Sequence, residues 1–250
     1  MQKRTKKLLF ICRAAGETPI PRRYPPSLPT PYRLKVFWFF FAKKARLPHR
    51  LPSQFAPIGT IRVKDTIYVF ARAPRLGTVK RRLAAEIGDR AALRFYLATL
   101  TAVLRRLEAD RRFRTVVAVT PDRGPMTWAR GLPVVAQGPG GLEARMGRVF
   151  RRHPRGRVAI VGSDIPAVTA ADIVQAFRAL GRAPACFGPA EDGGYWLVAM
   201  GPRRPAAPFR GVRWSSRFAL GDTRANFRHH RIEMLRTLRD VDTAADLRKG

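Results

Sequence analysis

Blocks of consecutive apolar residues alternate with stretches of three- and four-residue periodicity along the second part of the chain. The blocks are rich in β-branched and aromatic residues, as is typical of buried strands; they lie at residues 66–71, 115–119, 133–137, 158–161, 185–187 and 196–200. The periodic stretches predict helices at residues 78–88, 89–109, 142–150, 169–180 and from about 217 to 228. Strands that alternate with helices, without internal repeats, predict an α/β fold with an open, mostly parallel sheet and helices on both faces.

Polar residues mark the expected helix ends. Thr78 is a plausible N-cap for the first helix, which should end near Gly88, and Asp89 is the expected cap of a long helix. The leucines of that helix recur at three- and four-residue steps and predict a packing face. Thr169 and Asp172 form a capping-box pattern at the start of a later helix.

Residues 1–64 do not have the pattern of a folded domain. They combine nine prolines with dense positive charge and little periodicity, which favours disorder. The apolar run at residues 36–42 is too short to cross a bilayer, although a membrane-surface anchor is an alternative. We expect one folded domain at residues 65–250, and we hypothesise that the extension is not part of the working protein, with translation starting near Val63.

The formal net charge of +32 is extreme and comes mainly from arginine. A basic surface attracts phosphate, nucleic acid and anionic lipid without specificity, so a nucleic-acid-binding protein is one alternative. The arginines are scattered rather than gathered on one predicted face, which favours simple solvation. Cys12 and Cys186 form no metal spacing and no disulfide framework, and a reducing, cytoplasmic location is therefore expected.

The most distinctive stretch, residues 188–197, has two adjacent carboxylates and two glycines between apolar runs. Glu191 and Asp192 offer the hard oxygen ligands that Mg²⁺ or Mn²⁺ prefers. Gly193 and Gly194 permit positive φ and close approach of a ligand to the backbone. The alternative is an ordinary hairpin turn, in which Asp-Gly is a favoured dipeptide.

Other loops also follow predicted strands. Gly77, Lys80 and Arg82 follow the first strand and suit a diphosphate, although a basic surface helix would look the same. Asp164 follows another strand at the place where a metal–nucleotide site is expected, and a turn or cap residue is the alternative. For Asp240 and Asp242 helix capping is the stronger explanation. Ligands of such sheets bind beyond the carboxyl ends of the strands, so these loops are predicted to converge.

Five motifs occur in a fixed order in this part of the chain. They are Phe70-Ala71-Arg72-Ala73-Pro74-x-x-Gly77-x-Val79-Lys80-x-Arg82-Leu83, Gly162-Ser163-Asp164-x-Pro166, Gly188-Pro189-Ala190-Glu191-Asp192-Gly193-Gly194-Tyr195, Trp214-Ser215, and Asp240-Val241-Asp242-Thr243-x-x-Asp246-Leu247. Together they resemble a bacterial family of glycosyltransferase-A-like proteins, often labelled as transferases of arsenosugar-type biosynthesis or as associated with radical-SAM and selenium domains. That family is similar to phospholactate and molybdenum-cofactor guanylyltransferases.

The resemblance implies a nucleotide-diphospho-sugar transferase fold and a set of site residues. The nucleotide and its phosphates would contact Ala71, Pro74, Gly77, Lys80, Arg82 and Arg145. Asp164 and Asp192 would hold Mg²⁺ or Mn²⁺, and Asp192 or Glu191 is the candidate base. The acceptor side would include Gly193, Gly194, Tyr195 and Trp214. The chain departs from the family's usual Lys-Thr-Arg-Leu at Arg81 and from its Asp-Leu-Gly-x-Arg at Gly141 and Glu143.

The expected activity is metal-dependent glycosyl transfer from a nucleotide-diphosphate sugar to a small acceptor. Nucleotidyl transfer from a nucleoside triphosphate to a small phosphorylated acceptor uses the same residues and is the first alternative. A nucleic-acid-binding role and a relative that only binds nucleotide are the others. The expected partners are small molecules, with no specific nucleic acid and no transmembrane segment.

Overall fold

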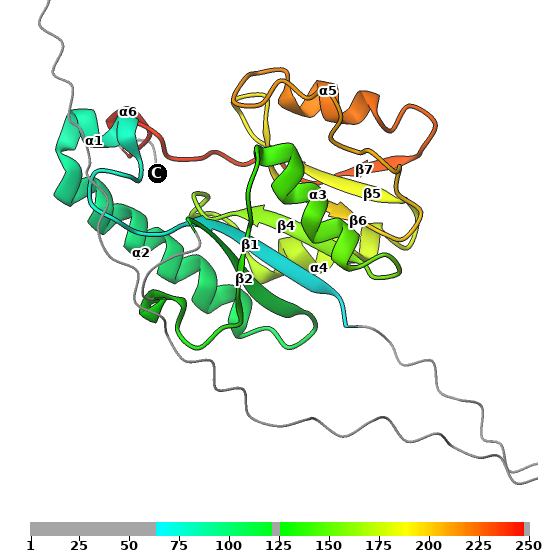
Figure 1. The fold of residues 1–250 in the computed structure, drawn as a ribbon, viewed down its shortest axis with the longest axis horizontal. Helices are drawn as coiled ribbons and strands as arrows, with labels where there is room; N and C mark the ends of the chain where they lie inside the picture. The colour runs from blue at the N-terminus through cyan, green and yellow to red at the C-terminus, as the bar shows by residue number, and fades with distance from the viewer. Residues whose placement is uncertain (1–63, 122–125, 248–250) are drawn as a thin grey trace, which may run out of the picture. The chain divides into compact units, whose positions relative to one another are not determined.

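The computed structural model describes residues 64–121 and 126–247, which form a seven-stranded sheet flanked by helices (Figure 1). The predicted extension, apart from Lys64, lies outside the described residues. The strands are β1 Thr66–Arg72, β2 Arg114–Thr120, β3 Val134–Ala136, β4 Val158–Gly162, β5 Ala185–Pro189, β6 Tyr195–Met200 and β7 Ile232–Met234. The helices are α1 Arg81–Ile87, α2 Asp89–Glu108, α3 Leu142–Arg152, α4 Ala170–Ala179, α5 Ala219–Ala225 and α6 Ala244–Leu247, with a short 3-10 turn, η1, at Thr127–Ala129.

The strand order is β3-β2-β1-β4-β6-β5-β7. β1 pairs in parallel with β2 and β4, β2 with β3, and β5 with β7, whereas β6 is antiparallel to both β4 and β5. The predicted open, mostly parallel sheet is therefore confirmed. Because β6 alone reverses, the other six strands all end at one edge of the sheet, which we call the carboxyl edge.

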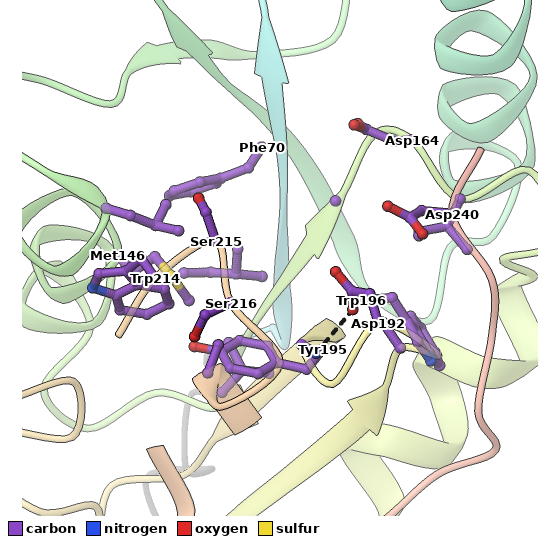
Figure 2. Close-up of a pocket in the computed structure, with 18 residues that line it drawn as sticks. Phe70, Met146, Asp164, Asp192, Tyr195, Trp196, Trp214, Ser215, Ser216 and Asp240 are labelled. Atoms are coloured by element: carbon purple, nitrogen blue, oxygen red, sulfur yellow. Dashed lines mark hydrogen bonds between the residues drawn. The ribbon is translucent and has the colours of Figure 1, made fainter. Parts of the chain in front are cut away.

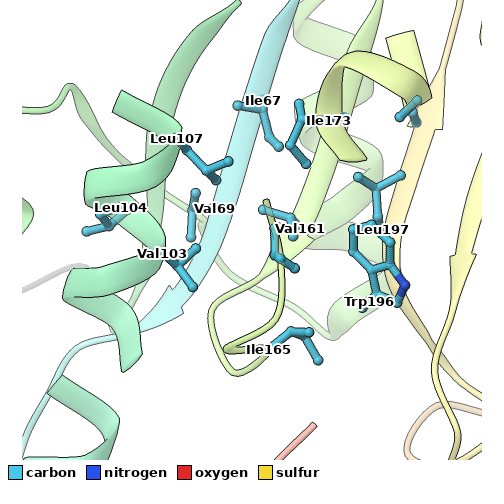
Figure 3. Packing of buried hydrophobic residues seen from close by; sticks show 14 of the residues in the cluster. Ile67, Val69, Val103, Leu104, Leu107, Val161, Ile165, Ile173, Trp196 and Leu197 are labelled. Carbon is cyan, nitrogen blue, oxygen red and sulfur yellow. The ribbon is translucent and has the colours of Figure 1, made fainter. Parts of the chain in front are cut away.

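Two hydrophobic clusters cover the two faces of the sheet. Alternate residues of β1 point to opposite sides: Ile67 and Val69 pack on the face with α2 and α4, and Tyr68 packs on the face with α3 and α5. Figure 3 shows the first cluster, where Leu104 and Ile173 come from the two covering helices. Each such side chain, fully buried, contributes about 1.5–3 kcal/mol. The two clusters hold the helices against the sheet and so make it a rigid support for the loops at the carboxyl edge.

The ends of the helices test the predicted caps. At α4 the capping box is present: the backbone N–H of Thr169 donates to Asp172 Oδ2 at 2.9 Å, and the N–H of Asp172 donates to Thr169 Oγ1 at 3.3 Å. The prediction of Asp89 as a cap is wrong, because Asp89 is the first residue of α2, whose N-cap is Gly88 without a side-chain cap hydrogen bond. The prediction of Thr78 as N-cap of the first helix is also wrong. Its hydroxyl donates to the carbonyl of Arg75, and α1 begins only after Lys80, whose left-handed backbone (φ 46°) prevents an earlier helical turn.

The last part of the chain differs from the prediction in two places. α5 ends at Ala225 instead of near Arg228, because turns follow it. β7 was not predicted, because three residues with a central Glu233 are too short to show an alternating pattern. Its strand conformation depends on the parallel pairing with β5. At α6 the backbone N–H of Thr243 donates to Asp246 Oδ2 at 2.9 Å and the N–H of Asp246 donates to Thr243 Oγ1 at 3.4 Å, which are the two hydrogen bonds of a capping box. Within residues 64–121 and 126–247, no helix is both long and apolar enough to span a membrane.

Candidate active site

Four loops meet at the carboxyl edge because the strands before them run in the same direction. They are the loop after β1, the loop after β4, the β5–β6 turn and the segment after β7. The segment after β7 is tied to the turn by hydrogen bonds, with the N–H of Leu238 donating to Pro189 O at 3.0 Å and the N–H of Glu191 donating to Leu238 O at 3.2 Å. Residues far apart in sequence are thereby brought to one place.

Lys80 lies at the centre of this meeting point. Its side chain is only 4% exposed, and its Nζ lies 3.0 Å from Asp164 Oδ2 and 2.8 Å from Asp242 Oδ1. Burial alone would lower the pKa of Lys80, but the two carboxylates outweigh it and the pKa is raised. The ammonium therefore stays protonated at neutral pH. The juxtaposition of Lys80 with Asp164, which the convergence of the loops predicts, is observed.

Two backbone positions beside the site adopt the left-handed conformation without being glycine. Lys80 has φ 46° and Ser215 has φ 56°. Such a conformation is uncommon for residues with a Cβ and costs energy, so it persists only where the surroundings hold it. At Lys80 the two ion pairs supply that restraint, and they also fix the direction of the side chain.

Asp164 is held from its other side by a hydroxyl network. The Ser163 hydroxyl donates to Asp164 Oδ1 at 2.8 Å and lies 3.3 Å from the hydroxyl of Tyr96. Tyr96 in turn donates to the carbonyl of Arg72 at 2.8 Å and accepts from its N–H at 3.0 Å. Burial raises the pKa of Tyr96, which stays a neutral donor. The end of β1 and the carboxylate after β4 are thus linked through α2.

A pocket of about 290 Å³ opens beside this network (Figure 2). Its charged side chains are Asp164, Asp192 and Asp240, which lie on one side of the view. The opposite side is apolar and aromatic and comes from β1, α3, β4, β6 and the loop before α5. Phe70, Met146 and Trp214 lie on that side in Figure 2, and Leu142, Ile160 and Val198 also line the pocket. The pocket thus joins an acidic half to an apolar half.

The acidic half concentrates negative charge. Burial raises the pKa of Asp240, and the neighbouring carboxylates of Asp242 and Asp192 raise it further, while Lys80 acts against them. Asp192 Oδ1 accepts the N–H of Gly194 at 2.8 Å. In the described part of the chain, no three Asp, Glu, His or Cys side chains form a preassembled metal site. The carboxylate oxygens and their mutual repulsion nevertheless fit a hard divalent cation whose other ligands come from substrate or water.

The predicted acceptor-side residues separate into two groups. Gly194, Tyr195 and Trp214 line the pocket. Glu191 does not line it; its carboxylate accepts a hydrogen bond from Arg239 at 2.6 Å. Gly193 is approached by the chain itself, because a Cβ there would lie 2.3 Å from the carbonyl oxygen of residue 217.

None of the six predicted phosphate-side residues lines the pocket. Ala71 is buried at the end of β1, and Pro74 and Gly77 belong to the loop that follows, with Gly77 at φ 70°. Arg82 is exposed, and its guanidinium lies 3.7 Å from Asp242 Oδ2. The guanidinium of Arg145 donates to the carbonyl of residue 140 at 2.7 Å.

Sequence reasoning undervalued Asp240 and Asp242. Both stand just before the capping box of α6, and in the sequence alone a capping role accounts for two aspartates at these positions. In the structure Asp240 lines the pocket and Asp242 pairs with Lys80. The gathering of acids into a few loops of a very basic chain was the signal that pointed to them. Ser163 and Tyr96, which hold Asp164, carried no such signal.

Comparison with known proteins shows which family model and which solved structures the chain resembles. A family model described as "uncharacterized protein conserved in bacteria (DUF2064)" matches residues 103–216. A solved structure from Desulfovibrio desulfuricans, provisionally assigned as a nucleotide-diphospho-sugar transferase, is 25% identical, with a TM-score of 0.67 over 73% of this chain and 84% of that one. The chain has the nucleotide-diphospho-sugar transferase fold. The narrower arsenosugar-type label remains a prediction.

More distant structures share the fold. The 4-diphosphocytidyl-2C-methyl-D-erythritol synthase of Anaerococcus prevotii is 10% identical, with a TM-score of 0.51 over 74% of this chain and 95% of that one. A cytidylyltransferase of Leptospira borgpetersenii is 15% identical, with a TM-score of 0.51 over 74% and 83%. No curated protein matches the chain in sequence. The neighbours named here are transferases that share its architecture.

Proposed function

We propose that this protein is a metal-dependent transferase that moves a glycosyl group from a nucleotide-diphosphate sugar to a small acceptor. The observation that carries the proposal is the contact of Lys80 with Asp164 at the carboxyl edge, beside a pocket with acidic and apolar halves. The fold and the similarity to a provisionally assigned nucleotide-diphospho-sugar transferase support the choice of donor.

The chain's own residues have distinct roles in this proposal. Asp164 would hold a divalent cation. Asp240 replaces the predicted Asp192 as its partner in this proposal, because its carboxylate faces the same pocket and lies among like charges, while Asp192 is given to the acceptor. When bound, Mg²⁺ or Mn²⁺ would supply positive charge close to the donor diphosphate. Lys80 fixes the position of Asp164, and the exposed Arg82 is the side chain best able to reach the phosphates from solvent.

The proton of the acceptor must go to a base. Of the two carboxylates predicted for this role, Asp192 lines the pocket, whereas Glu191 is engaged by Arg239. We therefore assign the role to Asp192. In the transfer, the acceptor hydroxyl oxygen bonds to the anomeric carbon and the bond from that carbon to the diphosphate oxygen breaks. The hydroxyl proton would pass to Asp192, and the diphosphate would leave as an anion that the exposed guanidinium of Arg82 would stabilise.

Ligand-dependent melting tests the binding part of the proposal. Purified protein is heated with a panel of nucleoside triphosphates and nucleotide-diphosphate sugars, with and without Mn²⁺, alongside the variant Asp164→Ala. A ligand that binds the native state raises the melting temperature by mass action. We expect a nucleotide-specific rise that needs the metal and is lost in the variant. A rise with any polyanion, equal in wild type and variant, would instead favour a nucleic-acid-binding role.

Product analysis separates the two transfer reactions. Glycosyl transfer releases a nucleoside diphosphate, whereas nucleotidyl transfer from a triphosphate releases inorganic pyrophosphate. Pyrophosphate release would replace the proposal by its first alternative, nucleotidyl transfer. Metal-dependent binding without release of either product, across a broad acceptor panel, would indicate a relative that only binds nucleotide.

A further inference from the structure

The pocket beside Asp164 lacks positive charge in a chain that is full of it. Lys and Arg account for 49 of the 250 residues, yet none of the 18 described residues lining the pocket is Lys or Arg. A second groove on the described part of the chain offers a contrast, since Arg151 and Arg204 both line it. Arginine side chains therefore line another groove of this protein but not this pocket.

The charged groups that line the pocket are all negative. Asp164, Asp192 and Asp240 face it (Figure 2), and of the three only Asp164 makes an ion pair with Lys80. At an effective dielectric constant of about 20, unit charges at van der Waals separation still interact by several times the thermal energy. A divalent cation at Asp164 and Asp240 would offset two of these charges, but the carboxylate of Asp192 and the donor diphosphate would still repel a phosphate or carboxylate on the acceptor.

The apolar half of the pocket favours a ligand with a hydrocarbon or aromatic part. Met146 is buried on α3, Ile160 and Val198 come from neighbouring strands, and the rings of Phe70 and Trp214 border the same space. Anion recognition in proteins uses Arg, Lys or runs of backbone N–H groups. The apolar wall instead matches a ligand whose bulk is hydrocarbon or aromatic, and the volume of about 290 Å³ is at the small end for ligand pockets.

We infer that the acceptor is a small neutral molecule with an apolar body and a hydroxyl group, and that it carries neither phosphate nor carboxylate. The inference rests on the proposed function, because it gives this pocket to the acceptor. In the proposed arrangement the apolar body lies against Met146 and Trp214, and the hydroxyl points to Asp192. The phosphorylated acceptor of the nucleotidyl-transfer alternative does not fit this pocket.

The methyl NMR signal of Met146 reports binding in this pocket, because Met146 lines it. The protein is labelled with ¹³C at its methionine methyl groups, and the Met146 signal is assigned with Met146→Leu. The probes are 2-phenylethanol and 2-phenylethyl phosphate, titrated at physiological salt so that weak binding to surface arginines is screened. We expect 2-phenylethanol to shift the Met146 signal saturably, and the phosphate ester to bind at least roughly tenfold more weakly.

Two variants make the test specific for charge. Ser215→Lys adds a cation at the exposed rim of the pocket and should raise the affinity for the phosphate ester. Ala98→Lys adds the same charge on the exposed surface of α2 and should leave that affinity unchanged. Equal or tighter binding of the ester in the wild type would overturn the inference, and so would the absence of any Met146 shift with either probe.

The outcome is separable from that of the proposed function. Metal-dependent nucleotide binding combined with preference for the phosphate ester would leave the transferase proposal standing and remove the neutral acceptor. Binding of 2-phenylethanol without any nucleotide effect would remove the transferase proposal, and with it the acceptor role, and would leave only a pocket that prefers neutral ligands.

Discussion

Replacing Asp172 by alanine should weaken the fold at the point where the segment carrying Asp240 is anchored. Asp172 is buried at the start of α4, where it completes the capping box with Thr169. Its carboxylate also accepts two hydrogen bonds from Arg236, at 2.7 Å from Nε and 2.8 Å from Nη2. The carbonyl of Arg236 accepts the indole N–H of Trp196 at 3.1 Å. The segment after β7 is thereby held to α4 and β6.

The expected loss follows from these contacts. The cap contributes about 1 kcal/mol. The charge-assisted bonds to Arg236 contribute about 1–2 kcal/mol, since its guanidinium is 51% exposed and regains water when the partner is lost. The total is about 2–3 kcal/mol, which corresponds to a fall in melting temperature of roughly 5–10 °C for a domain of this size.

Calorimetry or circular dichroism at neutral pH measures this change. Glu86→Ala serves as the control, because Glu86 is an exposed carboxylate on α1 with no ion pair within the described ranges. Its replacement should leave the melting temperature almost unchanged. The double variant with Arg236→Ala should be less destabilised than the sum of the two single variants. A melting temperature for Asp172→Ala within about 1 °C of wild type would refute the reasoning, because it would leave nothing for the cap to contribute.

The same group makes a prediction about pH. Burial alone would raise the pKa of Asp172, but the hydrogen bonds from Arg236 and Thr169 outweigh it and lower the pKa. The stabilisation is therefore complete above the ordinary value of 3.8 and is lost as the pH falls through the lower value in the folded protein. The difference in stability between wild type and Asp172→Ala should shrink in acid, as measured by urea unfolding at a series of pH values.

Three further predictions concern single positions. Gly193→Ala should be destabilised by more than Gly131→Ala, because both have positive φ but only at residue 193 would a Cβ meet backbone, at 2.3 Å; equal melting temperatures would contradict this. Gly188→Ala should shift the near-ultraviolet circular dichroism, since its Cβ would lie 2.3 Å from the ring of Trp196, and an unchanged spectrum with unchanged stability would count against that contact. Burial raises the pKa of Cys186 to about 12, so at pH 8 this thiol should resist alkylation in the native protein and react after unfolding, as peptide mass spectrometry would show; rapid native labelling would disprove it.

The sheet was predictable because its strands are apolar blocks with few competing interpretations. Residues 158–161, for instance, are buried on both faces of the sheet, and a continuous apolar run in the sequence is typical of such a strand. The three-residue β7 has too little pattern of its own, and its position depends on pairing with β5. The start of α1 also depended on tertiary contacts, because the ion pairs of Lys80 hold a backbone conformation that local propensity does not favour.

The candidate site was predictable where a loop follows a strong strand, as with Asp164. The site was less predictable where an aspartate could equally be a helix cap or a site residue. Asp240 and Asp242 precede a helix, and their position in the sequence is equally typical of capping. Only the direction of β7 brings them to the carboxyl edge. Glu191 and Asp192 are neighbours in sequence, but one turns to Arg239 and the other to the pocket, and no pattern distinguishes them.

The reversal of β6 gives the two edges of the sheet unequal tolerance to insertions. Because β6 is antiparallel to β4 and β5, the tight β5–β6 turn lies at the carboxyl edge, where Asp192 and Gly194 border the pocket. Extra residues in that turn would change the pocket directly. The connection that leaves β6 after Met200 starts at the opposite edge and reaches the pocket only at Trp214, Ser215 and Ser216. Relatives of different length should therefore vary first in the part of this connection that precedes Trp214, with little consequence for the chemistry.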